Sequence, residues 1–101
     1  MKPQIRKLGT IDLDLVETTP IVFKGRLYRF EYVRERYWAN TTGKSYFRFI
    51  EQESGTVCPP FAQDYHQGNV FVDRDTLLFV TSTNAWGGEK IDILASQDMQ
   101  H

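Results

Sequence analysis

Two short stretches of the sequence combine side chains that can do acid–base chemistry. Glu17 stands shortly before one apolar run, and Asp64, Tyr65 and His66 stand shortly before another. A positioned carboxylate can act as a general base or accept hydrogen bonds from hydroxyl groups. An imidazole close to a carboxylate titrates near neutral pH. Glu17 and Asp64 are therefore candidate catalytic carboxylates, and the alternative for each is a solvated loop carboxylate. His66 and Tyr65 are candidate substrate-binding residues, and the alternative for the histidine is a loop residue bonded to the backbone.

The two tryptophans, Trp38 and Trp86, each lie in a stretch rich in turn-forming residues. An exposed indole in such a loop can stack on the face of a sugar ring, so both are candidate substrate-binding residues. The alternative is that both cap the hydrophobic core, where large aromatic side chains usually lie.

Other chemistry is poorly supported by the sequence. A single cysteine, Cys58, can form no internal disulfide, and with only two histidines it makes a poor ligand set for zinc. We therefore predict no metal and no cofactor. Twelve basic against thirteen acidic residues give a net charge of −1, which argues against a nucleic-acid partner.

No apolar run approaches the ~20 residues that span a bilayer, so no membrane partner is predicted. The first ten residues lack the apolar core of a signal peptide, and none is predicted. The compartment stays unknown.

Strand patterns dominate the rest of the chain and must position these side chains. Residues 26–34 alternate polar and apolar types, which places Tyr28, Phe30 and Tyr32 on one face of a half-buried strand. No stretch shows helical periodicity with caps, so the sequence predicts an all-β fold. The expected strands span residues 20–24, 26–34, 45–50, 69–72, 76–81 and 90–95, with a possible short strand at 56–58.

The sequence contains a weak internal repeat. Sliding it by 49 residues places Phe30 on Phe79 and Glu17 on His66, and after the middle loop an offset of 45 places Ile50 on Ala95. Repeats of ~40–50 residues with three or four strands are typical of β-propeller blades. The alternative is a pair of independent hairpins in a β-sandwich.

The repeat divides the chain into two blade-like units of antiparallel β-meander, within one β domain or domain fragment that spans residues 1–101. The first unit covers residues 15–63, and the second, truncated unit covers 64–101.

Three segments carry a resemblance to a known family. Residues 17–28 resemble the opening blade of five-bladed β-propeller glycosidases, the glycoside hydrolase family 43-like group, and residues 61–72 are similar to the entry into their second blade. Residues 86–98 look like the strand that ends in an S-x-D-L-x-x-W pattern in such proteins, and Met99 stands where the leucine is usual. Thr19-Pro20 stands where the family usually has Asp-Pro.

The resemblance implies blades around a central axis, with a sugar site at one mouth of it. Family members use three carboxylates from different blades to hydrolyse glycosidic bonds in polysaccharides. Two blades cannot supply the full set, so we expect an incomplete catalytic set and an inactive isolated chain. The alternative is a non-catalytic carbohydrate-binding or self-assembling propeller module. The resemblance implies a bacterial parent protein that is cytoplasmic, periplasmic or secreted.

One feature separates the two functions. An enzyme needs a second acid, such as Asp64 or Asp92, aimed at the same end of the fold as Glu17. Carbohydrate is the expected partner in either case. Two isolated blades leave sheet faces without a neighbour, so we also expect a homo-oligomer that forms through blade faces or edge strands.

Overall fold

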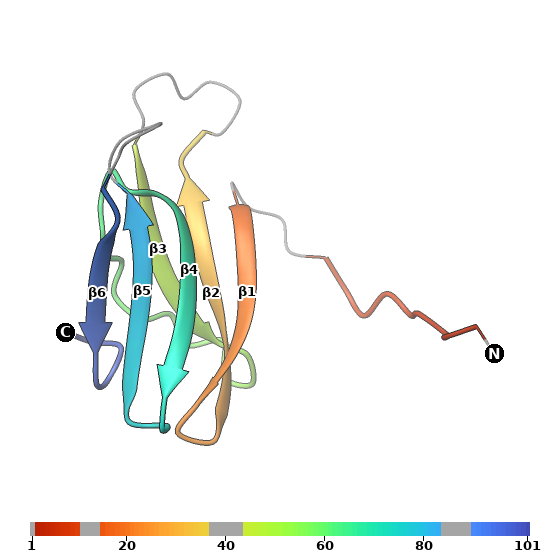
Figure 1. Cartoon of the computed structure of the whole chain (residues 1–101). Coiled ribbons are helices and arrows are strands. Elements are labelled where there is room, and N and C mark those ends of the chain that lie inside the picture. Colours follow the sequence, from red (N-terminus) through yellow and green to blue (C-terminus); the bar gives the residue numbers. More distant parts are fainter. Residues whose placement is uncertain (1, 11–14, 37–43, 84–89) are drawn as a thin grey trace.

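The computed structural model describes residues 2–10, 15–36, 44–83 and 90–101, and within these ranges it contains six strands and no helix. The prediction of an all-β fold with two antiparallel units is therefore confirmed (Figure 1). Sheet A has the order β1-β2-β3 and sheet B the order β4-β5-β6. The strands are β1 (Leu15–Phe23), β2 (Arg26–Arg34), β3 (Ser45–Glu51), β4 (His66–Asp73), β5 (Leu77–Thr83) and β6 (Asp92–Ser96). In the described ranges no helix is long and apolar enough to cross a membrane.

The strand β1 begins earlier than its sequence suggests. Pro20 was expected to open the strand, but it lies inside β1 and is paired in register with Arg29. A proline is tolerated there because β1 is an edge strand, where a missing ladder donor costs little. The following hairpin turns on Lys24 and Gly25, whose φ angles of 50° and 76° suit a tight two-residue turn.

Sheet A carries an additional outer segment beside β3. Val57 forms an isolated bridge with Ile50, and the amide of Cys58 donates to the carbonyl of Phe49 at 2.8 Å. The possible strand at 56–58 is thus found as a short bridged segment. Pro59 and Pro60 follow it at once, and proline supplies no ladder donor.

Each sheet has a β-bulge near the start of its first strand, and the two bulges give a structural alignment of the two units. The pairing shifts at Val16 in β1 and at Gln67 in β4, where φ is 54°. Aligning the two bulges places Glu17 on Gly68. The expected equivalence of Glu17 with His66 is therefore not the one that the strand register supports.

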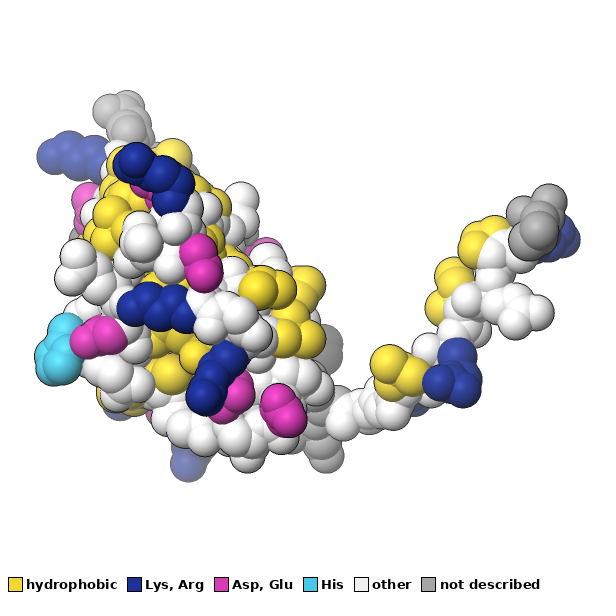
Figure 2. Space-filling view, turned by 90° about the horizontal axis from the view of Figure 1, so that it is seen from below, with side chains coloured by type: hydrophobic (Ala, Val, Ile, Leu, Met, Phe, Trp, Pro, Cys, Tyr) yellow, Lys and Arg dark blue, Asp and Glu magenta, His cyan; other side chains and the backbone are white. Residues whose placement is uncertain are grey.

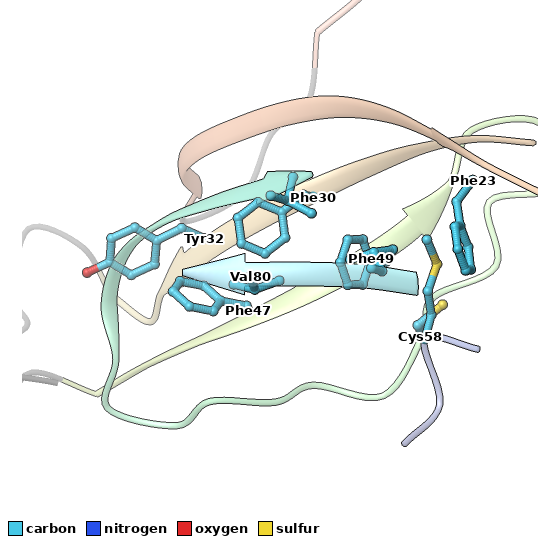
Figure 3. Close-up of a cluster of buried hydrophobic side chains, with 10 residues drawn as sticks. Phe23, Phe30, Tyr32, Phe47, Phe49, Cys58 and Val80 are labelled. Carbon is cyan, nitrogen blue, oxygen red and sulfur yellow. The ribbon is translucent and has the colours of Figure 1, made fainter. Parts of the chain in front are cut away.

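The two sheets pack face to face, with the closest approach between β1 and β4. Both strands start at the top of Figure 1 and run downward, and the two sheets share the same strand order across the view. The core between them is largely aromatic, and extends in Figure 3 from Tyr32 at one end to Phe23 and Cys58 at the other. A Cβ at Gly68 would lie 2.9 Å from Cζ of Phe47, so this glycine permits the close approach.

The N-terminal segment 2–10 extends away from both sheets, as Figures 1 and 2 show. Ile5 and Leu8 within it are 93% and 86% exposed. This segment contributes nothing to the core.

Candidate functional site

A shallow polar hollow lies where the start of β1 approaches β4 and β5, and its volume is about 380 Å³. Most of its lining side chains carry hydroxyl, amide or carboxylate groups, which hydrogen-bond well to hydroxyl-rich ligands. The lining residues are Glu17, Gln67, Gly68, Asn69, Thr81, Ser82, Thr83 and Ile91.

Glu17 is the acidic member of this lining. It is the third residue of β1, where the sequence suggested a position before the strand, and its side chain is exposed. Within the described residues its carboxylate takes part in no ion pair or side-chain hydrogen bond. The carboxylate is therefore available to accept hydrogen bonds from a ligand.

Asn69 and Thr81 contribute the neutral polar groups opposite. They pair in register across β4 and β5, so their side chains share one face of sheet B. Neither was singled out from the sequence. Side chains alternate along β4, so Asn69 lies on the face opposite the buried Val70. This alternation could have identified Asn69 as a surface residue from the sequence.

His66 lies behind the hollow and is not part of its lining. It is the first residue of β4, is 5% exposed, and its Nδ1 lies 3.0 Å from the hydroxyl of the buried Tyr32. The hydroxyl of Ser82 donates to the backbone carbonyls of His66 and Gln67 at 3.1 and 2.8 Å. These contacts hold the bulge that presents Gln67 to the hollow.

Burial lowers the pKa of His66 below its ordinary value, and the charge of Arg34 lowers it further, while Asp64 opposes the shift. Because the folded protein disfavours the imidazolium, the unfolded chain binds this proton more readily below about pH 6.5. The free energy of unfolding is thus expected to be highest above that pH and to fall as the pH drops through it.

This prediction is checked by urea denaturation at about pH 7.5 and about pH 5.5. We expect His66→Gln to flatten the loss of stability between the two pH values. An unchanged slope in the His66 variant would contradict the prediction.

The other predicted residues lie away from the hollow. The Tyr65 hydroxyl donates to the carboxylate of Asp92, which raises the pKa of the tyrosine. Tyr65 also lines an apolar pocket of about 310 Å³ between residues 59–62, the C-terminal segment and the inner side of sheet B. Asp64 is exposed, and its amide donates to the carbonyl of Ser45 at 2.9 Å.

The structure therefore brings Glu17 together with neutral polar groups and not with Asp64 or Asp92, neither of which lines the hollow. Trp38 and Trp86 lie outside the described residues. In the part of the chain that the structure describes, no three His, Cys, Asp or Glu side chains gather in a way that would hold a metal ion.

Comparisons with known proteins do not assign the chain to a family. No protein-family model matches it, no curated protein matches it, and no solved structure matches it. The fold and the hollow define it as an all-β protein of two packed meanders with a polar surface site at their shared edge.

Proposed function

We propose that this chain is a carbohydrate-binding unit of a β-propeller-like protein, similar to the family 43-like glycosidases, and that it binds sugar without hydrolysing it alone. The observation that carries the proposal is the hollow that joins Glu17 to Asn69 and Thr81. A sugar presents many hydroxyl groups that donate and accept. A carboxylate, an amide and a hydroxyl around one open hollow match that pattern.

The placement of the acids favours binding over hydrolysis. An inverting glycosidase needs two carboxyl groups about 6.5–9.5 Å apart on either side of the scissile bond. Among the acids that the structure describes, only Glu17 lines the hollow, whereas Asp92 is engaged by Tyr65 near the other pocket. Further carboxylates would have to come from other units of a larger assembly or protein.

The arrangement of the sheets supports the propeller-like part of the proposal. The first strands of the two units, β1 and β4, approach each other most closely and run in the same direction. Sheet A also has its additional segment at the far edge, beside β3. Blades around an axis have this form, with first strands together and outer strands apart. The resemblance of residues 17–28 and 61–72 to such blades is consistent with it.

Titration with xylo- and arabino-oligosaccharides, followed by amide chemical shifts, tests the binding site. We expect weak binding, with a Kd near the millimolar range, and shifts that centre on Gln67, Asn69 and Thr81. Glu17→Gln should weaken binding by about tenfold, because hydrogen bonds to a charged acceptor are the strong ones. No reducing sugar should be released.

The matched control is Glu53→Gln, which changes an exposed acid beyond the end of β3. It should bind as the original chain does. Equal affinity in the Glu17 and Glu53 variants, or shifts that centre on the apolar pocket around Tyr65, would overturn the proposed site.

A further inference from the structure

The large hydrophobic side chains that remain exposed on the two sheets fall into two groups. Outside the N-terminal segment, those of the described residues are Val22, Leu27 and Val57 in the first unit, and Phe71, Ile91 and Ile93 in the second. Val22 is 60% exposed and Ile93 is 67% exposed. Each group gathers on one face of its own sheet.

Strand register shows that the first group lies on the face of sheet A that points away from sheet B. Val22 pairs with Leu27, and Val57 pairs with Ile50. Side chains alternate between faces along a strand, and the neighbouring Phe23 points into the core. We call this surface the outer face of sheet A.

The second group lies on the face of sheet B that points away from sheet A. Phe71 pairs with Phe79, and their rings stack with centroids 4.9 Å apart. Ile93 pairs with Thr81, while the alternate residue Val80 points into the core. We call this surface the outer face of sheet B.

The two sheets are stacked in the same sense. They share strand order and strand direction, so the aromatic face of sheet A and the outer face of sheet B point the same way. Phe30, which lies on the first of these faces, is covered by sheet B, whereas Phe79 on the second has no sheet above it among the described residues. A third sheet that packs on sheet B in the way that sheet B packs on sheet A would cover the rings of Phe71 and Phe79.

We propose that the outer face of sheet B binds the outer face of sheet A of a second copy of this chain. This contact continues the internal stacking from one copy to the next. Because the contact joins two different surfaces, it is a head-to-tail contact. A dimer formed in this way has a free outer face of sheet A at one end and a free outer face of sheet B at the other. The proposal does not rest on sugar binding, but Asn69, Thr81 and Ile91 of the polar hollow lie on the outer face of sheet B as well, so this contact would compete with a sugar for that face.

Charged side chains lie on both outer faces beside the hydrophobic groups. On the outer face of sheet A, the guanidinium groups of Arg29 and Arg48 share the single carboxylate of Glu31, which leaves an excess positive charge. By strand alternation the outer face of sheet B carries the carboxylate of Asp73 beside Phe71, and the guanidinium group of Arg74 contacts this carboxylate at 3.4 Å. Aromatic rings also attract guanidinium groups.

Two variants block one face each. Ile93→Glu places a carboxylate on the outer face of sheet B, and Val22→Glu places one on the outer face of sheet A. Both positions are more than half exposed, so the fold should be kept, and circular dichroism would verify this. Ile5→Glu in the N-terminal segment is the matched control.

Sedimentation velocity over the micromolar range measures the association. We expect the original chain and the Ile5 variant to associate, and each single-face variant to raise the dissociation constant at least tenfold, because it buries a charge without a partner. Mixing the two single-face variants should give a dimer of one copy of each, since one intact surface of each kind remains.

The mixing result decides the geometry. An original chain that stays monomeric, or a mixture that stays monomeric, would overturn the proposal. So would association that only Ile93→Glu disrupts, because a contact between two outer faces of sheet B would behave in that way. A closed ring or a longer open chain in the original protein would both agree with a head-to-tail contact.

Discussion

Replacing Phe47 by alanine is expected to lower the free energy of unfolding by about 3–5 kcal/mol, which is the usual cost of removing a buried phenylalanine ring. Phe47 is fully buried, and its ring centroid lies 5.2 Å from that of Phe30 and 5.6 Å from that of Tyr32. A domain of this size has roughly 5–15 kcal/mol to lose. Denaturation in urea, followed by circular dichroism, measures the change.

The matched control is Phe61→Ala, which removes the same side chain from a half-buried position beside Phe47. It should cost clearly less, because its ring is already partly in water. Equal losses in the two variants would mean that the centre of the sheet-to-sheet contact does not lie at Phe47.

The space between Gly68 and Phe47 provides a second check on the same contact. Gly68→Ala alone should destabilise the protein by about 1–3 kcal/mol, because the new methyl group crowds the Phe47 ring. In a Phe47→Leu background the added cost should fall. A double-mutant cycle that shows no coupling between the two positions would contradict the close approach of Gly68 to the Phe47 ring.

Glu31→Ala is expected to lower the free energy of unfolding by about 3–5 kcal/mol, the range found when one member of a buried ion pair is removed. The Glu31 carboxylate is completely buried and accepts from Nε of Arg48 at 2.9 Å and from Nε of Arg29 at 3.1 Å. Its loss leaves two largely buried guanidinium groups without their shared partner.

Asp73→Ala is the control for this substitution. It removes an exposed ion pair with Arg74, whose atoms are 3.4 Å apart, and such pairs contribute about 0–1 kcal/mol. Urea denaturation compares the two variants under the same conditions. A loss in Glu31→Ala no larger than that in Asp73→Ala would show that the buried carboxylate does not stabilise sheet A.

Most of the fold could be predicted from local patterns. The alternation of residues 26–34 specifies β2 with its observed bounds, because a polar–apolar period of two is typical of a strand. The strand was expected to be half-buried, but Glu31 and Val33 on its other face are buried as well. The start of β1 was missed because a proline normally opens or ends a strand, and only the position of β1 at a sheet edge removes that restriction. Edge positions depend on tertiary pairing, which a local pattern does not contain.

The site was less predictable than the fold. Glu17, which lines the hollow, was singled out because an isolated acid before an apolar run is visible in the sequence. The burial of His66 depends on Tyr32, which comes from the other sheet. Gln67 reaches the hollow through a bulge with a positive φ angle, and a glutamine gives no local sign of that conformation. Asn69 was hidden for a similar reason, since its partner Thr81 is fixed only by strand register.

The strict order of the sheets along the chain has a consequence for synthesis on the ribosome. Every strand pairs only with its neighbours in sequence, so sheet A can form as soon as its three strands have emerged. Its aromatic face, which includes Phe30 and Phe47, then remains exposed to solvent until β4 and β5 have been synthesised and pack on it. A pause in translation between the two units would therefore lengthen the time for which the aromatic face of sheet A is exposed and prone to aggregation.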